Sequence, residues 1–128
     1  MKFRGTEMAS QTDSRIGAEN ACMVYVTVGA HAEATMLART AVGERLAACA
    51  NILGPATSIY RWKGEVEEAQ EFVLIFKTRR TLSGQLAARI KALHSYATPC
   101  IVTYAMTAAD PAFLGWLAAE TVDPESAS

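Results

Sequence analysis

His94 and Cys100 are the most suggestive pair of side chains for metal chemistry, because imidazole nitrogen and thiolate sulfur suit Cu(I), Zn(II) and other soft or borderline metals. A closed site needs about four donors, and this region adds only Tyr96 and backbone carbonyls unless another subunit contributes. The structural alternative places His94 at a helix C-terminus, where it favours the helix dipole, and Cys100 in the core as a small apolar side chain. We treat both as candidate metal ligands.

Four glutamates form a second group of candidate ligands, since carboxylates could attract hard cations such as Ca²⁺, Mg²⁺ or Mn²⁺. Because they are spread over a predicted hairpin, the alternative is a solvated face that protects a strand edge. The members of this group are Glu65, Glu67, Glu68 and Glu71.

Lys77 lies in an otherwise apolar stretch, and a buried ammonium without a partner is costly. We expect a structural ion pair with a carboxylate such as Glu71 or Glu44, and the functional alternative is an anion contact at a cleft between subunits. Aromatic side chains nearby could stack on a ligand, although aromatic residues on a paired strand are usually interface or core. The candidate cleft or ligand-contact residues are Lys77, Arg79, Tyr60, Trp62, Glu68 and Tyr96.

The sequence contains few of the motifs that enzymes use. The GxSxG elbow, the Walker loop, HExxH and CxxC are all missing, and the chain has two histidines. Small hydrolases of the acylphosphatase kind need a glycine-rich cradle with an arginine after the first strand, whereas residues 29–33 read GAHAE. We therefore predict a protein that is not an enzyme, with no catalytic residues.

Composition restricts the class of protein further. With 128 residues and a formal charge of -1, the chain can build one core and shows no basic footprint for nucleic acid. No apolar run approaches the ~20 residues that a membrane span needs. Three cysteines without close spacing argue against a disulfide framework and favour reduced thiols in a cytoplasm. Residues 1–21 are predicted to be a disordered leader, because they mix charges with small polar groups and do not resemble a secretory signal.

The strands that must position these residues follow from hydrophobic patterning. β-Branched and aromatic residues indicate strands at 22–28 and, after Pro99, at 100–106. A short strand broken by Gly54-Pro55 leads into a long hairpin that turns at residues 63–65. The return limb at 72–76 is apolar at every position, so both of its faces should be buried.

Helices are predicted at 32–48 and between Thr81 and His94, because apolar residues recur there at three- and four-residue spacings. Asp110 and Pro111 are an N-cap and a first-turn proline, which indicate a third helix. We expect residues 22–121 to form the domain and 122–128 to be a flexible tail.

The order β-α-β-β-α-β-α predicts an α+β fold of the ferredoxin-like type with an added C-terminal helix and a long hairpin. Two helices cover only one side of such a sheet, yet the strands at 72–76 and 100–106 are apolar on both sides. Exposing that surface would create an aggregation-prone patch. We therefore expect other copies of the chain to cover it, with the edge strands available for pairing between copies.

Three stretches of the sequence form a recognisable pattern: ERLAACANILGPATSIYRWKGEVEEAQEFVLIFKTR at 44–79, LHSYATPCIV at 93–102 and FLGWLAAET at 113–121. Through these stretches, and over residues 22–121, the chain resembles the CutA family of divalent-cation tolerance proteins. This resemblance implies a ferredoxin-like subunit assembled as a homotrimer, and a role in tolerance of copper and other divalent metals. An imidazole-and-thiolate copper site has been proposed for some members of that family.

Individual positions match the family unevenly. The motif HPYExPE reads HSYATPC here, so His94, Tyr96 and Pro99 match while Ser95, Ala97 and Cys100 do not. The cysteine and double histidine proposed as copper ligands in some members correspond to Val26 and to Leu93-His94. The positions that match the hairpin are Tyr60, Trp62, Gly64, Glu67, Glu68, Glu71 and Lys77.

Two functions follow as hypotheses. The first is a cytoplasmic homotrimer of the CutA type that acts in metal tolerance through weak binding of copper or another divalent metal, or as an assembly platform. The second is a trimeric sensor related in architecture to the PII-like proteins, which binds a small anionic ligand between subunits through Lys77 and Arg79.

Overall fold

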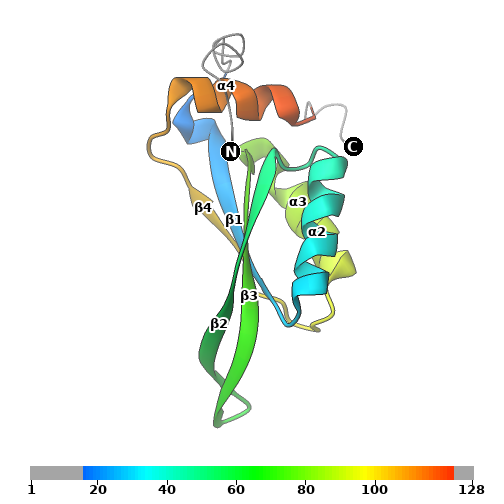
Figure 1. Ribbon diagram of the computed structural model, residues 1–128. Helices are drawn as coiled ribbons and strands as arrows, with labels where there is room; N and C mark the ends of the chain where they lie inside the picture. The colour runs from blue at the N-terminus through cyan, green and yellow to red at the C-terminus, as the bar shows by residue number, and fades with distance from the viewer. Residues whose placement is uncertain (1–15, 123–128) are drawn as a thin grey trace.

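Strand β1 (Ala21–Val28) lies inside the sheet in the computed structural model of the protein, which describes residues 16–122 (Figure 1). It pairs antiparallel with β3 (Glu65–Arg79) on one side and with β4 (Ile101–Ala105) on the other. The complete order is β2-β3-β1-β4, with β2 at Cys49–Trp62. The predicted ferredoxin-like α+β arrangement is confirmed.

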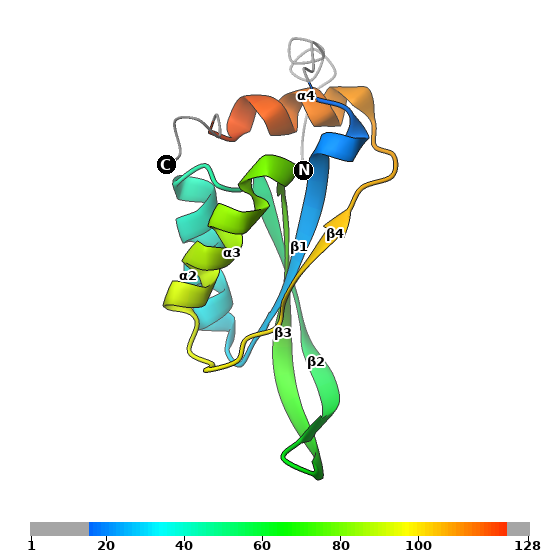
Figure 2. The ribbon, with the colours of Figure 1, turned by 180° about the vertical axis from the view of Figure 1, so that it is seen from behind.

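The hairpin of β2 and β3 is longer than the other strands and reaches well beyond the helices (Figures 1 and 2). Its turn lies at Lys63 and Gly64, which have φ of 50° and 83°, as the glycine predicted. The register shifts between Leu53 and Ala56, where the chain passes through Gly54 at φ 138°. A Cβ at Gly54 would lie 3.0 Å from Phe72 Cδ1, so this bulge needs glycine.

Helices α2 (His31–Gly43) and α3 (Ser83–Leu93) cover one face of the sheet (Figure 2). Alternate β1 side chains point into the core beneath them, because successive residues of a strand face opposite sides. The shared core contains Val24, Val26, Leu37, Ala41, Leu74, Phe76, Leu86 and Ile90, each almost fully buried.

Both helices are shorter than the sequence predicted. The prediction that the first helix continues to Ala48 is wrong, because Arg45 adopts a left-handed φ of 62° directly after the helix ends at Gly43. The chain from Leu46 to Ala48 then leads into β2. The second helix begins at Ser83, after a 3₁₀ turn, η2 (Arg80–Leu82).

Helix α4 (Pro111–Glu120) lies across the end of the sheet that is remote from the hairpin turn (Figure 1). The predicted cap is confirmed, since Asp110 Oδ2 accepts a hydrogen bond of 3.1 Å from the Phe113 amide. Leu114 and Leu117 pack in a second, smaller core with Ala21 and Ala48. Within residues 16–122, no helix is long and apolar enough to cross a membrane.

The described part of the chain begins before the predicted domain boundary. A 3₁₀ turn, η1 (Ala18–Asn20), precedes β1, and Ile16 and Ala18 pack beside the smaller core. Of the predicted leader, residues 1–15 lie outside the described part of the chain, as do residues 123–128 of the predicted tail.

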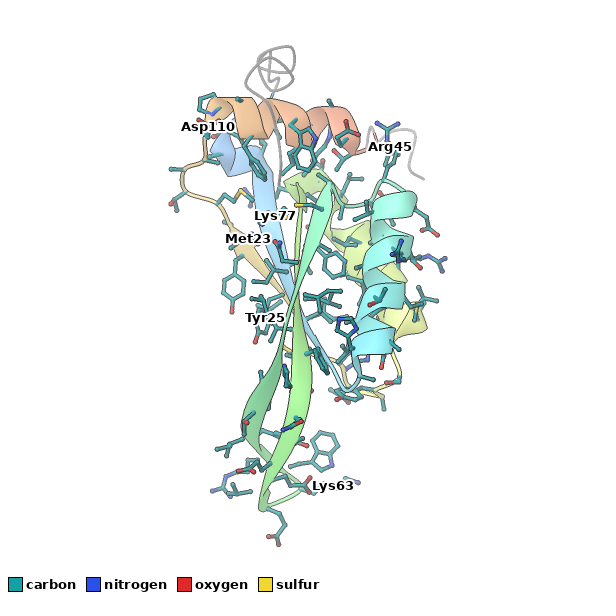
Figure 3. All side chains as sticks on the ribbon, viewed as in Figure 1. Met23, Tyr25, Arg45, Lys63, Lys77 and Asp110 are labelled. Atoms are coloured by element: carbon teal, nitrogen blue, oxygen red, sulfur yellow. The ribbon has the colours of Figure 1, made fainter. Side chains whose placement is uncertain are left out.

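The second face of the sheet carries no helix and is largely apolar. Met23 and Tyr25 lie on the side of β1 away from α2 and α3 (Figure 3). Their partners on β4 are Tyr104 and Val102, which are 52% and 41% exposed. Apolar side chains thus stand on both faces of the sheet, as predicted, but the single chain covers only one of them.

Candidate functional site

His94 is the C-cap residue of α3, as the structural alternative predicted. Its imidazole is fully buried, with Nε2 2.8 Å from the Thr27 carbonyl oxygen and Nδ1 3.0 Å from the Tyr96 amide nitrogen. A carbonyl can only accept and an amide N–H can only donate, so these two contacts fit the tautomer that carries its proton on Nε2. Both nitrogens are therefore already used within the chain.

Cys100 is exposed, so the alternative that it packs as a small apolar side chain is wrong. Cys22, near the start of β1, is buried. Within residues 16–122, no three His, Cys, Asp or Glu side chains gather in a way that could hold a metal ion. The pairing of His94 with Cys100 as metal ligands stays a prediction, and it would require the imidazole to give up one of its hydrogen bonds.

Glu33 and Ser95 brace the turn that follows His94, and sequence reasoning missed both. The Glu33 carboxylate accepts hydrogen bonds from the Ser95 amide at 2.9 Å and from the Ser95 hydroxyl at 2.8 Å. It also lies 3.6 Å from His94 Nδ1. The available signal was the replacement of a motif proline by Ser95, because proline has no amide hydrogen to donate.

Tyr96 connects this turn to Glu71 on β3, at the root of the hairpin, where the hairpin leaves the body of the sheet. Its hydroxyl donates a hydrogen bond of 3.0 Å to Glu71 Oε2, and Glu71 is only 9% exposed. Burial, then the hydrogen bond and charge of Glu71, raise the pKa of Tyr96 to about 12. A Cβ at Gly29 would lie 3.1 Å from the Tyr96 hydroxyl oxygen, so a bare backbone lets the phenol reach Glu71. Tyr96 thus serves as a clamp on the hairpin root.

Within residues 16–122, Lys77 does not form the ion pair that the sequence predicted. Its ammonium donates a hydrogen bond of 2.7 Å to Asn51 Oδ1. The two expected partners are engaged elsewhere, since Glu44 pairs with Arg89 at 2.8 Å and Glu71 accepts from Tyr96. Lys77 is half-buried on the helix-free face, where a neutral amide oxygen can replace a carboxylate because water still reaches the site.

Cys49 stands opposite Lys77 in the strand register. Burial raises the pKa of the Cys49 thiol, and the nearby charge of Lys77 opposes that shift only in part. The thiol is therefore protonated at neutral pH, which makes it a poor metal ligand or nucleophile in the single chain.

Arg79 holds the end of α4. Its guanidinium donates to the Ala118 carbonyl oxygen at 2.6 Å and to Thr121 Oγ1 at 2.9 Å. Arg45, which sequence reasoning missed, donates to the Ala119 carbonyl oxygen at 2.8 Å. Cations at a helix C-terminus satisfy carbonyls that have no partner in the helix. Arg79 is thus a structural cap here.

Tyr60, Trp62 and Glu68 lie on the outer part of the hairpin and are exposed. The Lys63 ammonium lies 5.9 Å from the Trp62 ring centroid at the turn (Figure 3). Two further exposed side chains, Ile59 at 68% and Val66 at 64%, stand beside them. The six predicted cleft residues therefore occupy separate places in one chain: the outer hairpin, its root, the open sheet face and the end of α4.

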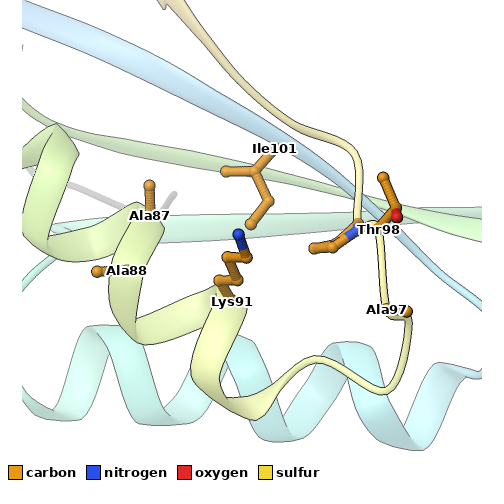
Figure 4. A pocket seen from close by; sticks show the side chains of 7 residues that line it. Ala87, Ala88, Lys91, Ala97, Thr98 and Ile101 are labelled. Carbon is orange, nitrogen blue, oxygen red and sulfur yellow. The ribbon is translucent and has the colours of Figure 1, made fainter.

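A surface hollow of about 400 Å³ lies between α3 and the segment that leads into β4 (Figure 4). Lys91 extends from α3 toward Ile101 at its centre, and Thr98 supplies a hydroxyl. The floor is otherwise formed by methyl and ring groups. The lining residues are Ala87, Ala88, Lys91, Ala97, Thr98, Pro99 and Ile101.

Comparison with known proteins gives a consistent result. Residues 22–120 match the family described as CutA1 divalent ion tolerance protein. A relative from Thermus thermophilus, "Divalent-cation tolerance protein CutA", is 43% identical over 99 residues, which cover 77% of this chain and 96% of the relative. "Protein CutA, chloroplastic" from Arabidopsis thaliana is 38% identical over 95 residues, which cover 74% of this chain and 52% of the relative.

Solved structures agree with the sequence match. The divalent cation tolerance protein of Thermus thermophilus superposes with a TM-score of 0.77 at 42% identity, covering 80% of this chain and 99% of that one. CutA1 from Oryza sativa superposes with a TM-score of 0.79 at 35% identity, covering 81% and 95%.

Proposed function

Because this chain belongs to the CutA1 divalent ion tolerance protein family, we propose that it acts in tolerance of copper or another divalent cation as a cytoplasmic homotrimer without catalytic activity. The names of its relatives support the metal-tolerance role. The absence of enzyme motifs from the sequence supports a non-catalytic protein. The three cysteines form no disulfide in the described part of the chain, which supports a cytoplasmic location. A similar structure from Archaeoglobus fulgidus is described as periplasmic.

The main support for the proposed trimer is the exposed apolar surface on the helix-free face of the sheet. Val73 and Ile75 on β3 continue the apolar surface that Met23 and Tyr25 begin on β1. Tyr104 and Val102 extend it across β4. An open apolar surface of this kind marks a protein interface, and other copies of the same chain are the simplest cover.

The sheet edges support a closed ring. The order β2-β3-β1-β4 leaves β2 and β4 as the two edges, and their antiparallel pairings make these two strands run in opposite directions. The β2 edge of one copy can therefore pair antiparallel with the β4 edge of the next. Such a head-to-tail contact closes into a ring when the rotation between copies fits, and three copies would place the helix-free faces inward.

Any metal site in this proposal is shared between copies. The described chain gathers no set of three donors, and a closed site needs about four. A neighbouring subunit could add ligands to Cys100, which is exposed, or to His94, which would first have to free a ring nitrogen. The structure thus favours a tolerance protein that works as an assembly, with weak metal binding at most in each chain.

The sensor hypothesis gains no support from the two cations on which it rests. Arg79 is engaged with the C-terminus of α4, and Lys77 donates to Asn51. The relatives and similar structures named above are all CutA proteins.

Two measurements test the proposed function. Light scattering should give a mass about three times the 13.7 kDa of one chain. Thermal shift should show stabilisation by Cu(II), Cu(I) or Zn(II) that is lost in His94→Ala, with Cys49→Ala as a control thiol that the proposed site does not use. A trimer without any metal response would remove the metal-binding part and leave the assembly role.

A further inference from the structure

We propose that a metal ion binds between His94 and Glu33, with the imidazole Nδ1 and the carboxylate Oε2 as its two protein ligands and Zn(II) or Cu(II) as the ion. This site rests on the metal-binding part of the proposed function and names a second ligand for it. Glu33 takes the place that residue types alone gave to Cys100.

The imidazole of His94 is oriented like that of a metal ligand. Its Nε2 lies 2.8 Å from the Thr27 carbonyl oxygen, and its Nδ1 faces the Tyr96 amide. A histidine that binds a metal usually donates its other ring N–H to a carbonyl or carboxylate oxygen, which fixes the ring and presents the free lone pair to the ion. The contact with Thr27 is of that kind. Nδ1 is therefore the nitrogen that can bind a metal.

Glu33 is held beside this nitrogen by hydrogen bonds of its own. Its Oε1 accepts from the Ser95 hydroxyl at 2.8 Å, and its Oε2 accepts from the Ser95 amide at 2.9 Å. The side chain of Glu33 is 15% exposed, and that of His94 is fully buried. Because water screens a largely buried carboxylate only weakly, its charge attracts a cation strongly. The pair thus combines a fixed imidazole with a fixed negative charge.

The spacing of the two ligand atoms fits a single ion. His94 Nδ1 and Glu33 Oε2 are 3.6 Å apart. Zinc binds imidazole nitrogen at about 2.0–2.1 Å and carboxylate oxygen at about 2.0–2.2 Å, so two such ligands at the tetrahedral angle are about 3.4 Å apart. The observed separation is within about 0.2 Å of that value, and the two side chains need to move little.

Two backbone amides point at the atoms that the ion would bind. The Tyr96 N–H donates to His94 Nδ1 at 3.0 Å, and the Ser95 N–H donates to Glu33 Oε2 at 2.9 Å. Consecutive N–H groups carry partial positive charge, so here they stand where a cation would be attracted. Both belong to the turn after α3, and Ser95 and Tyr96 are exposed. On metal binding the ion replaces these N–H groups, which turn toward water.

The donor set selects among metals. Imidazole nitrogen suits Zn(II) and Cu(II), whereas Cu(I) prefers thiolate and thioether ligands. Within residues 16–122, no third His, Cys, Asp or Glu joins the pair. The remaining positions of a tetrahedral ion are left for water or for a donor from a neighbouring copy. Zn(II) and Cu(II) should therefore bind more tightly than Cu(I).

Calorimetric titration of the full, untagged chain with zinc chloride tests the site. Glu33→Gln keeps an oxygen that can accept from Ser95 but removes the charge. It should raise the Kd for zinc about tenfold or more, because loss of one group that merely supports a metal ligand already costs about that factor. Glu44→Gln is the matched control, since it makes the same change just after the other end of α2. Cys100→Ala should leave the Kd unchanged, and circular dichroism checks that each variant folds.

Hydrogen exchange measured by NMR gives a second readout. Zinc should speed exchange at the Ser95 and Tyr96 amides of the wild-type chain, because both amides lose their acceptors. The same zinc concentration should leave these amides unchanged in Glu33→Gln. Zinc binding that slows their exchange would overturn the site, since the amides would then still be hydrogen-bonded.

The outcomes separate this site from the proposed function. Zinc binding as tight in Glu33→Gln as in the wild-type chain would overturn the site and leave metal binding by the protein standing. Zinc binding that is lost in Cys100→Ala would also overturn it, because the ion would then be held by the thiolate. A wild-type chain that binds neither Zn(II) nor Cu(II) would overturn both the site and the metal-binding part of the proposed function.

Discussion

Replacing Tyr96 by phenylalanine removes one oxygen atom and tests how the hairpin is held to the body of the protein. The lost hydrogen bond joins the Tyr96 hydroxyl to Glu71 Oε2 at 3.0 Å. Because Glu71 is 9% exposed, water can replace the donor only poorly. A hydrogen bond to a charged, largely buried partner contributes about 1.5 to 3 kcal/mol, so Tyr96→Phe should lower the free energy of unfolding by that amount.

Urea unfolding at one fixed chain concentration measures this difference, because an assembled protein has a concentration-dependent midpoint. Tyr104→Phe makes the same chemical change at a ring on β4 whose hydroxyl has no hydrogen-bond partner among residues 16–122 of the chain, and it should cost less than about 0.5 kcal/mol. Hydrogen exchange should also speed up in the hairpin near Glu71 in the Tyr96 variant alone. Equal unfolding free energies for the two variants would refute the clamp.

Three further predictions concern other parts of the molecule. The free energy of unfolding should fall as the pH rises from about 10 to about 12. The folded pKa of Tyr96 lies above the ordinary value of 10, so folding favours the protonated phenol, and this stabilisation is lost as the pH passes through the folded pKa. Tyr96→Phe should reduce the dependence of the unfolding free energy on pH in that range, and an unchanged slope would contradict the assignment. Asp110→Ala should cost about 1 kcal/mol in urea unfolding, because α4 loses its N-cap acceptor, whereas Asp110→Asn should retain most of it. Leu74→Asp should abolish folding, as measured by circular dichroism, since that side chain is fully buried. Ile75→Asp on the helix-free face should stay folded but give a smaller mass in light scattering. A folded trimer of the Ile75 variant would count against an inward-facing sheet.

Strand and cap patterns were readable from sequence because they depend on neighbouring residues. The β-branched and aromatic run at 22–28 predicted β1, and Asp110 before Pro111 predicted the start of α4. The turn at Lys63-Gly64 followed from glycine's tolerance of positive φ. In each case the deciding chemistry lies within a few residues of the chain.

Other features depend on contacts between distant residues and gave no local signal. The first helix stops at Gly43 because Arg45 turns to reach carbonyl oxygens of α4, which lie 74 and 75 residues later in the chain. Lys77 has a neutral partner in Asn51 because the neighbouring strand places it there.

The candidate metal site shows the same limit. Ligand chemistry singled out His94 and Cys100, but only the fold shows that the imidazole is buried with both nitrogens hydrogen-bonded. The role of Glu33 depends on α2 meeting the turn at Ser95 across 62 residues of sequence. Residue types indicate which side chains could bind a metal, whereas contacts with residues distant in the sequence decide whether those side chains are available to bind it.

Light scattering of the purified wild-type chain at micromolar and lower concentrations tests the covered sheet face most directly. A mass near three times 13.7 kDa that persists on dilution is the expected result. A stable species of one chain mass, with native circular dichroism and with Val102 and Tyr104 open to solvent, would contradict it.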